Sequence, residues 1–328
     1  SDAELGIYHA ELYVDGTKTY EWTNDRLNFD DTRYANAHSD YLVRKRDGIR
    51  IERAYRMEGD FFLPIYPDTS LTGITDFSGD DSHDLRFVAT DFSGNKAQMN
   101  FQLQASSALA DKPYQPHSKD ALLVTPYQGI AVHKEDLDVI VPAGSVYQSM
   151  YYSDDEVLNN RALSNTFLIG DPYEALHIPI TVAIRPNKEI NDSMRSKVLM
   201  ARMEPDGNLS ALGGTWNKEF LTAKSRDFGR FILTYDTIAP TVTKEYYPAD
   251  LNTYLGGVVV LVISDDLSGI KSYEAKVDGT WHLAQYEVKT GRVTIDLSGV
   301  ELNHEHRIEF TVTDERGNTN DWTGTFWW

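Results

Sequence analysis

The chain has 328 residues, and its 50 acidic and 31 basic side chains give a formal net charge of −19. Such an acidic chain is a poor candidate for nucleic-acid binding, because phosphate contacts need clustered lysine and arginine. Its hydrophobic fraction of 41% supports packed cores, its length suggests two or three domains, and it lacks the run of about 18 apolar residues that crosses a membrane. The absence of cysteine excludes disulfides, thiolate metal sites and a cysteine nucleophile.

The first predicted module comprises residues 1–105. The pair Asp15-Gly16 lies between two runs of strand-forming residues, which is typical of a tight hairpin turn. Four strands are expected in this module: Ala10–Val14, Thr19–Thr23, Leu85–Ala89 and Gln98–Leu103.

A helical insertion is predicted in this module after Trp22. Asp30 or Asp31 would cap a helix that runs to about Arg46, and Gly48 is the expected stop. Four side chains recur at spacings of three and four residues, which predicts that they share one helical face: Tyr34, His38, Tyr41 and Leu42.

The middle module is predicted at residues 106–237. It follows a stretch rich in Ser, Pro and Ala, Ala105–Lys119, which is typical of a linker. Asp236–Pro240 is the expected hinge to the next module, since proline stiffens it. The expected strands include Leu137–Val141, Ile178–Ile184, Lys197–Met203 and Phe228–Tyr235.

The last module is predicted at residues 238–328. The apolar, β-branched run Gly257–Ile263 indicates a buried strand. Further strands recur at roughly 8–12 residue spacing between Asp-Gly, Ser-Gly and Gly-Asn turns, which predicts a small immunoglobulin-like sandwich. We therefore expect an all-β chain of three β-sandwich modules in series, the outer two immunoglobulin-like and the first with a helical insertion.

The two outer modules repeat each other. Ser1–Thr17 aligns with Ser264–Thr280 over 17 residues without a gap, and 9 positions are identical. A second pair of matching segments follows in the same order, Thr90–Asn95 and Thr313–Asn318. Because two pairs of matching segments occur in the same order, we expect the two modules to share a common fold.

The repeat also predicts where the modules differ. Val14 lies 77 residues before Asp91, whereas Val277 lies 37 residues before Asp314, so the first copy carries an insertion of 40 residues. The second copy is preceded by Ile238–Ile263, for which the first copy has no counterpart. We expect from this that the N-terminal strands of the first sandwich are missing, that residue 1 is not the natural start, and that sequence lies upstream.

Acidic turns are candidate cation sites in the last module, because calcium takes carboxylate and amide oxygens in such loops. The other interpretation is that Asp and Asn cap the turns while Gly supplies positive φ. The first copy repeats the set with Asp2, Asp91 and Asn95. The candidate residues are Asp265, Asp266, Asp314 and Asn318.

Two histidines, His304 and His306, have strand spacing, so both imidazoles would point to one face and two metal ligands are geometrically feasible. No third ligand is evident nearby in the sequence, and strand-start histidines are usually surface residues. We therefore expect no metal site and no cofactor in this chain. Carboxylate pairs for glycoside chemistry are too common in so acidic a chain to be informative.

Aromatic side chains give the clearest indication of a binding surface. In the last strand Trp322, Phe326 and Trp328 share one face, and Trp327 lies on the other. An outward Trp either packs against a neighbouring module or stacks on a sugar ring. The candidate binding aromatics are Trp281, Trp322, Trp327 and Trp328.

Several segments resemble the region after the catalytic domain in large lysostaphin-type (LytM-like) zinc peptidases of Bacteroidetes-type bacteria. The resemblance covers nearly the whole chain, and Val139–Tyr147 also resembles the proline-glycine turn of ZU-five-type β domains. The segments that carry the peptidase resemblance are Gly6–Tyr8, Val14–Gly16, Asp30–Tyr41, Gly48–Arg53, Gly213–Trp216, Ser225–Gly229 and Asp236–Pro240.

The resemblance implies a periplasmic or secreted zinc endopeptidase that cuts cell-wall peptides. It implies that zinc is held in a catalytic domain upstream of this chain, by a His-x-x-x-Asp motif and a His-x-His motif. The first motif fits no position here, and His304 and His306 match the second only as a string, so no catalytic residue is transferred.

Three functions follow as hypotheses. The first is a non-catalytic accessory region of a cell-envelope zinc endopeptidase, which positions or docks the upstream catalytic domain and has peptidoglycan or an envelope protein as partner. The second is a stand-alone glycan- or protein-binding β-sandwich module, which exposed aromatics in a shallow groove would favour. The third is a hydrolase that uses two carboxyl groups about 5–10 Å apart.

Overall fold

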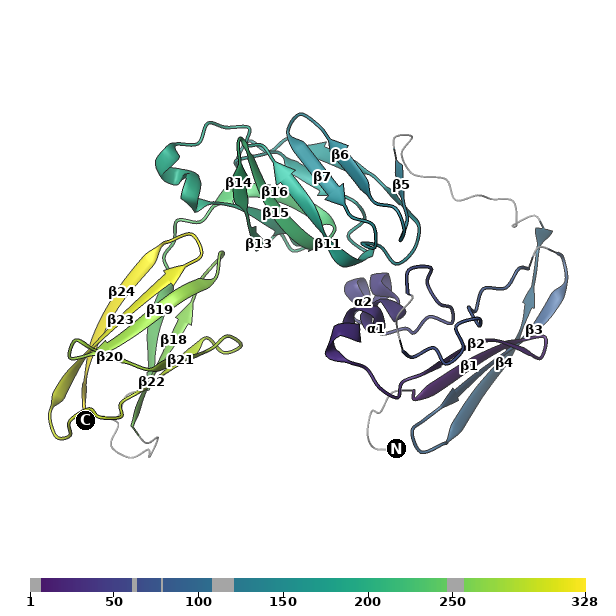
Figure 1. Ribbon diagram of the computed structural model, residues 1–328, viewed down its shortest axis with the longest axis horizontal. Helices are drawn as coiled ribbons and strands as arrows, with labels where there is room; N and C mark the ends of the chain where they lie inside the picture. Colours follow the sequence, from purple (N-terminus) through teal and green to yellow (C-terminus); the bar gives the residue numbers. More distant parts are fainter. Residues whose placement is uncertain (1–6, 61–63, 78, 108–120, 247–256) are drawn as a thin grey trace.

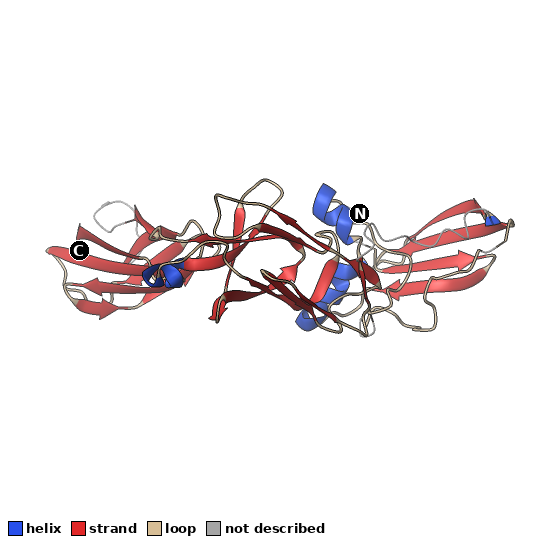
Figure 2. Cartoon of the chain, turned by 90° about the horizontal axis from the view of Figure 1, so that it is seen from above, coloured by secondary structure: helices blue, strands red, loops and turns tan. Residues whose placement is uncertain are grey.

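The computed structural model describes residues 7–60, 64–77, 79–107, 121–246 and 257–328. Three β-rich modules follow one another in chain order along an elongated, arched molecule (Figure 1). Strands form nearly all of its regular structure, which confirms the all-β prediction (Figure 2). The helices are short and belong to the first module, apart from 3₁₀ helix η2 (Asp192–Lys197) in the middle one.

The first module contains one four-stranded antiparallel sheet with the strand order β2-β1-β3-β4. The hairpin between the first two strands turns at Asp15 and Gly16, whose φ angles of 48° and 80° are the positive values that a tight hairpin needs. The strands are β1 (His9–Val14), β2 (Thr17–Thr23), β3 (Ser82–Thr90) and β4 (Lys96–Gln104).

The insertion is helical, but the prediction of one continuous helix is wrong. The segment contains η1 (Phe29–Asp31), α1 (Thr32–His38) and α2 (Tyr41–Asp47). The chain is extended at Ser39 and Asp40, because the Asp40 carboxylate caps the second helix by accepting from the Val43 amide at 3.0 Å.

The break also changes the predicted helical face. His38 is buried whereas Leu42 is exposed, so the four side chains do not share one face. The second helix ends at Gly48 as expected, in the left-handed conformation with φ of 69°.

The insertion covers the inner face of the first sheet over β1 and β2. Its Ile65 and Tyr66 pack against the buried side chains of those strands, while β4 is exposed along its whole length. The buried residues of this small core are Ala10, Tyr20, Trp22, Ile65 and Tyr66.

The middle module is a sandwich of two five-stranded antiparallel sheets with a two-stranded sheet, β5-β8, beside it. The sheet orders are β13-β12-β16-β10-β9 and β14-β15-β11-β7-β6. Part of the predicted linker, residues 108–120, lies outside the described residues. The strands are β5 (Leu122–Val124), β6 (Ile130–His133), β7 (Leu137–Val141), β8 (Met150–Tyr152), β9 (Asp154–Val157), β10 (Thr166–Ile169), β11 (Ala175–Ile184), β12 (Val198–Met203), β13 (Leu209–Gly213), β14 (Thr215–Asn217), β15 (Phe220–Asp227) and β16 (Gly229–Tyr235).

The last module is a sandwich of two four-stranded antiparallel sheets, β17-β18-β22-β21 and β20-β19-β23-β24. The predicted apolar strand is β18, in which Val259, Leu261 and Ile263 are buried and the residues between them are less so. The strands are β17 (Thr241–Tyr246), β18 (Val258–Ser264), β19 (Ile270–Val277), β20 (Thr280–His282), β21 (Ala284–Glu287), β22 (Arg292–Asp296), β23 (Glu305–Asp314) and β24 (Thr319–Trp327).

The repeat is visible in the strand order of the outer modules. Strands β2-β1-β3-β4 of the first module correspond one to one with β20-β19-β23-β24 of the last. The matched turns make Phe87 equivalent to Phe310, and both side chains face the interior of their module. In the described part of the first module no second sheet is present, and the insertion covers the face that the other sheet covers in the last module.

Hydrogen bonds cross both junctions between modules. The Tyr41 hydroxyl in the insertion donates to the Asp227 carboxylate of the middle module at 2.7 Å. At the second junction, Lys197 Nζ donates to Asn318 Oδ1 at 2.6 Å, and Arg316 donates to the Val198 carbonyl at 3.1 Å. These contacts link neighbouring modules through side chains as well as through the chain itself.

No helix among the described residues has the length and apolar character needed to cross a membrane.

Candidate functional site

Two of the four candidate tryptophans lie on the outer face of sheet β20-β19-β23-β24. In β23 the residues from His306 to Asp314 alternate, and every second one is buried in the core. Trp281 pairs with Lys276, which pairs with Glu309, and Trp327 pairs with Glu305. Because Glu305 and Glu309 point outward, both tryptophans share the outer face, and they are 61% and 55% exposed.

A shallow depression of about 280 Å³ lies on this face between the two edges of the sheet. Paired charges line it, with Lys276 3.2 Å from Glu274 and Arg307 3.1 Å from Glu309. The depression therefore offers many hydrogen-bond donors and acceptors. Its polar lining consists of Glu274, Lys276, Arg307, Glu309, Thr311, Asp321 and Thr323.

The other two candidate tryptophans have a packing role. Trp322 and Trp328 are partly buried against the core of the last module, on the side of the sheet opposite to Trp327. The Trp328 amide donates to the His304 carbonyl at 3.2 Å, which fastens the end of β24 beside the loop before β23. The four aromatic candidates thus divide into two outward and two inward side chains.

The acidic turn at Asp314 is occupied by contacts within the protein. Asp314 Oδ1 accepts from the amides of Arg316 and Asn318, each at 2.8 Å. The Asn318 side-chain amide donates to Asp314 Oδ2 at 2.7 Å and to the Asp236 carbonyl at 3.1 Å. Asp314 and Asn318 therefore stabilise the turn and the hinge between the middle and last modules.

Asp265 and Asp266 lie beside this turn, with one carboxylate oxygen each within 4.8 Å of one another and of Asp236. Asp265 Oδ2 caps its own turn by accepting from the Gly269 amide at 2.7 Å. Burial raises the pKa of Asp265, and the nearby Asp236 and Asp314 carboxylates add to this. In the first module the Asn95 side-chain amide donates to Asp91 Oδ2 at 2.7 Å, as Asn318 does to Asp314 in the last module. Asp2 lies outside the described residues.

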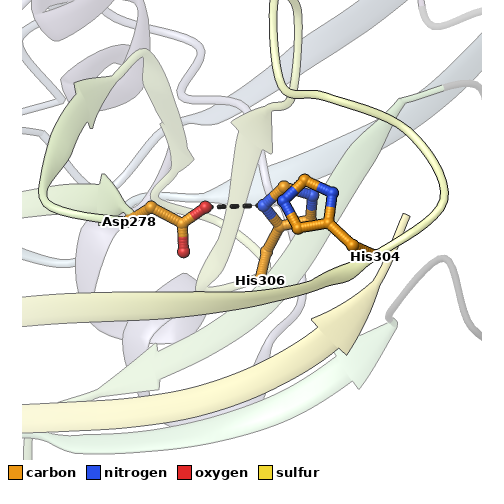
Figure 3. A group of neighbouring side chains, drawn as sticks. All are labelled: Asp278, His304 and His306. Atoms are coloured by element: carbon orange, nitrogen blue, oxygen red, sulfur yellow. Dashed lines mark hydrogen bonds and ion pairs between the residues drawn. The ribbon is translucent and has the colours of Figure 1, made fainter.

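A third group brings together residues that are distant in the sequence: Asp278, His304 and His306 (Figure 3). His306 is 2% exposed, and its Nδ1 lies 2.6 Å from Asp278 Oδ2. The rings of His304 and His306 are 3.9 Å apart between centroids. Amide donation from Arg307 and the contact with His306 lower the pKa of Asp278, so its carboxylate is the ionised form.

The sequence analysis missed Asp278 as the partner of the histidines, because it lies 26 residues before His304. The pairing of β19 with β23 brings the turn after β19 next to the start of β23. The signal in the sequence that could have identified Asp278 was the repeated Asp-Gly turn. The pairing register of the strands around this turn determines which residue lies beside its aspartate.

The first module contains a buried polar network that the sequence analysis also missed. The Tyr66 hydroxyl donates to Asp60 Oδ2 at 3.3 Å and lies 3.0 Å from His38 Nδ1. Burial raises the pKa of Asp60 to about 7 and lowers that of His38 to about 4, so burial favours the neutral form of both. His38, Glu52 and Trp22 border a half-open cavity of about 280 Å³.

Comparison with known proteins finds a similarity for the middle module. The model of the Zu5-like domain family matches residues 123–236, about a third of the chain, and this range includes the Val139–Tyr147 segment that resembles ZU-five domains. No curated protein matches the chain.

Two solved structures align with nearly the whole chain at low sequence identity and low TM-scores. One is a 1.5-MDa bacterial ice-binding adhesin described in a study of host cell surface retention, 12% identical, with 99% of this chain and 87% of that chain covered and a TM-score of 0.21. The other is SGBP-B of the Bacteroides ovatus mixed-linkage glucan utilization locus, in complex with a mixed-linkage heptasaccharide, 10% identical, with 99% of this chain covered and a TM-score of 0.17. This chain spans 62% of that second protein's length.

Proposed function

We propose that the chain is a binding protein of the cell envelope or the extracellular space, and that its last module binds a glycan on the outer face of sheet β20-β19-β23-β24. The observation that carries the proposal is the exposure of Trp281 and Trp327 on one face of one sheet. Tryptophan combines a large apolar ring with one N–H donor, and such side chains are enriched at interaction surfaces.

The spacing of the two rings suits an extended ligand. The two rings are separated by three inter-strand spacings across the sheet and by four residues along the strands. These offsets place the rings roughly 20 Å apart. The depression between them presents the charged and hydroxyl side chains of Lys276, Glu309 and Thr323 to the solvent. A glycan combines apolar ring faces with many hydroxyl groups, and so it complements a surface with aromatic ends and a polar middle.

The alternative for an outward Trp was packing against a neighbouring module. Trp281 and Trp327 keep more than half of their surface exposed with all three modules in place, so packing within the described chain does not account for them. A protein partner would use the same two exposed rings, so titration with glycans alone separates the two classes of partner.

Isothermal titration with soluble β-glucan oligosaccharides, together with co-sedimentation with purified peptidoglycan sacculi, tests the proposal. We expect saturable binding of at least one of these glycans, and a loss of at least about tenfold in affinity in W281A and in W327A, since truncation of a stacking aromatic costs on the order of 1.5–3 kcal/mol.

Phe92→Ala is the matched control, because Phe92 is an exposed aromatic in the first module. Its affinity should equal that of the parent chain. If W281A and W327A bind both glycans as tightly as the parent, or if neither glycan binds at all, the glycan proposal fails.

A second function is the accessory role beside a zinc endopeptidase. We propose it on one observation, the side-chain hydrogen bonds that cross both junctions, since a region that positions a catalytic domain must hold a defined geometry. Its partners would be the upstream catalytic domain, which would carry the zinc, and the peptidoglycan or an envelope protein.

Peptide mapping and intact mass of the native gene product from its own cells test this second function. A longer product that carries a further His-x-His sequence would support it. A native product of about this length would contradict it and leave the glycan proposal untouched.

A further inference from the structure

We propose that Asp278, His304 and His306 form a binding site for a divalent transition metal ion of the zinc type. The site lies at the end of the last module where β23 begins (Figure 3), and its ligands do not include the tryptophans of the glycan-binding face. One ligand atom from each residue lies within 4.8 Å of the others. Two imidazoles and one carboxylate are a ligand set typical of zinc, with a fourth position open to water.

The fold holds the carboxylate in place. Asp278 occupies the turn between β19 and β20 with a φ of 51°, which aspartate tolerates better than most residues. The Arg307 amide donates to Asp278 Oδ1 at 2.9 Å, and this leaves Oδ2 directed at His306. The first ligand is therefore oriented by a backbone amide on one oxygen and by the His306 side chain at the other.

The contacts of His306 select its ligand atom. Nε2 lies 2.8 Å from the Glu301 carbonyl oxygen, which can only accept, so Nε2 carries a proton and donates. Metal-bound histidines usually donate their second ring N–H to a carbonyl or carboxylate in this way. Nδ1 is then the atom that faces Asp278 Oδ2, at 2.6 Å. A metal ion would replace the proton between these two atoms and would move them apart to about 3.3 Å, since each bond to zinc is about 2 Å long.

The equivalent site in the first module contains a His–Asp pair without a second histidine. There His83 Nδ1 lies 2.7 Å from Asp15 Oδ2, and the Asp84 amide donates to Asp15 Oδ1 at 2.9 Å. The position of His304 is taken by Asp81. A hydrogen-bonded His–Asp pair beside the turn thus forms without a second histidine. The last module adds an imidazole whose ring lies against that of His306.

The test uses the whole chain, without an affinity tag and stripped of metal with a chelator. Zn²⁺ is titrated by calorimetry, and Co²⁺ is used as a spectroscopic probe because a tetrahedral site absorbs visible light. We expect one tight Zn²⁺ per chain. H304A and D278N should each weaken its binding by at least about tenfold and remove the Co²⁺ absorption.

The matched controls are H83A and D15N, which alter the equivalent pair in the first module and should leave Zn²⁺ binding unchanged. His306 is left intact because its burial makes a substitution there a risk to folding. Circular dichroism checks that H304A and D278N remain folded. The proposal is overturned if the parent chain binds no Zn²⁺, if H304A and D278N bind it as the parent does, or if H83A abolishes binding.

Discussion

The first and last modules contain the same four-stranded sheet but cover its inner face with different structures. In the last module a second sheet packs against it and twelve side chains are buried in one apolar cluster. In the first module the insertion packs over β1 and β2, the apolar cluster has five buried members, and β4 is exposed on both faces. A repeated sequence therefore preserves strand order, while the covering layer determines the size and polarity of the core.

The outer faces of the two sheets also differ, and this difference locates the proposed glycan site. The positions of Trp281 and Trp327 are taken in the first module by Lys18 and Gln104. Lys18 is engaged by Glu11 and Glu21 at 2.9 and 2.7 Å. The nearest aromatic there, Tyr13, is covered by the Arg86 guanidinium 4.1 Å from its ring centroid.

The largest expected difference concerns the two equivalent phenylalanines. Phe310→Ala should destabilise the last module by about 3–5 kcal/mol, because Phe310 is 1% exposed within a closed apolar core. Phe87→Ala should cost the first module clearly less, since Phe87 is only partly buried. Urea unfolding followed by ¹⁹F NMR of fluorotryptophan measures both, with Trp22 reporting on the first module and Trp322 on the last. Equal losses would show that the two cores are equally closed.

The second prediction uses the buried carboxyl group of the insertion. Burial raises the pKa of Asp60 from 3.8 to about 7, so between these pH values the folded module binds a proton that the unfolded chain releases. The contribution of Asp60 to stability is therefore present at low pH and is lost as the pH rises through this window. His38, with a lowered pKa, contributes in the opposite direction between about pH 4 and 6.5.

Comparison of the parent chain with D60N isolates the Asp60 contribution. The stability of the parent relative to D60N should fall by up to about 4 kcal/mol between pH 4 and 7, read from the Trp22 signal. D76N, which changes an exposed carboxyl of the same insertion, is the control for the removal of one negative charge. The Trp322 signal of the last module should be unaffected. A difference that stays constant with pH would mean that Asp60 is ionised throughout.

The smallest effect is expected in β4. Leu103 is equivalent to Phe326, which is 3% exposed, whereas Leu103 is 36% exposed. Leu103→Thr should change the stability of the first module by no more than about 0.5 kcal/mol, and Phe326→Ala should cost the last module several times more. The same two fluorotryptophan signals measure both. A large loss in the Leu103 variant would indicate that β4 is covered in solution.

Much of the fold was predictable because its signals are local. The Asp-Gly hairpins, the strand Leu137–Val141 and the stop at Gly48 depend on turn chemistry and short-range periodicity. The break between the two insertion helices was missed, although Ser39 and Asp40 are residues that favour an N-cap. An apparent helical face at Tyr34, His38 and Tyr41 suggested continuity instead.

The candidate sites were less predictable because they depend on register between distant strands. The outward orientation of Trp327 followed from alternation along one strand. Trp281 lies on the same face because β20 pairs with β19 and β19 pairs with β23. No local sequence pattern predicts this pairing. The same holds for Asp278 beside His306, and for the network of His38, Asp60 and Tyr66, which the folding of the insertion brings together.

The most direct test of the glycan-binding face gives the last module the residues of the first. The double variant W281K/W327Q would be compared with the parent chain by affinity electrophoresis in gels that contain the β-glucan or solubilised peptidoglycan bound by the parent. The account predicts that the glycan retards the parent and no longer retards the double variant, while the urea midpoint of the last module is unchanged. Equal retardation of the two proteins would contradict it.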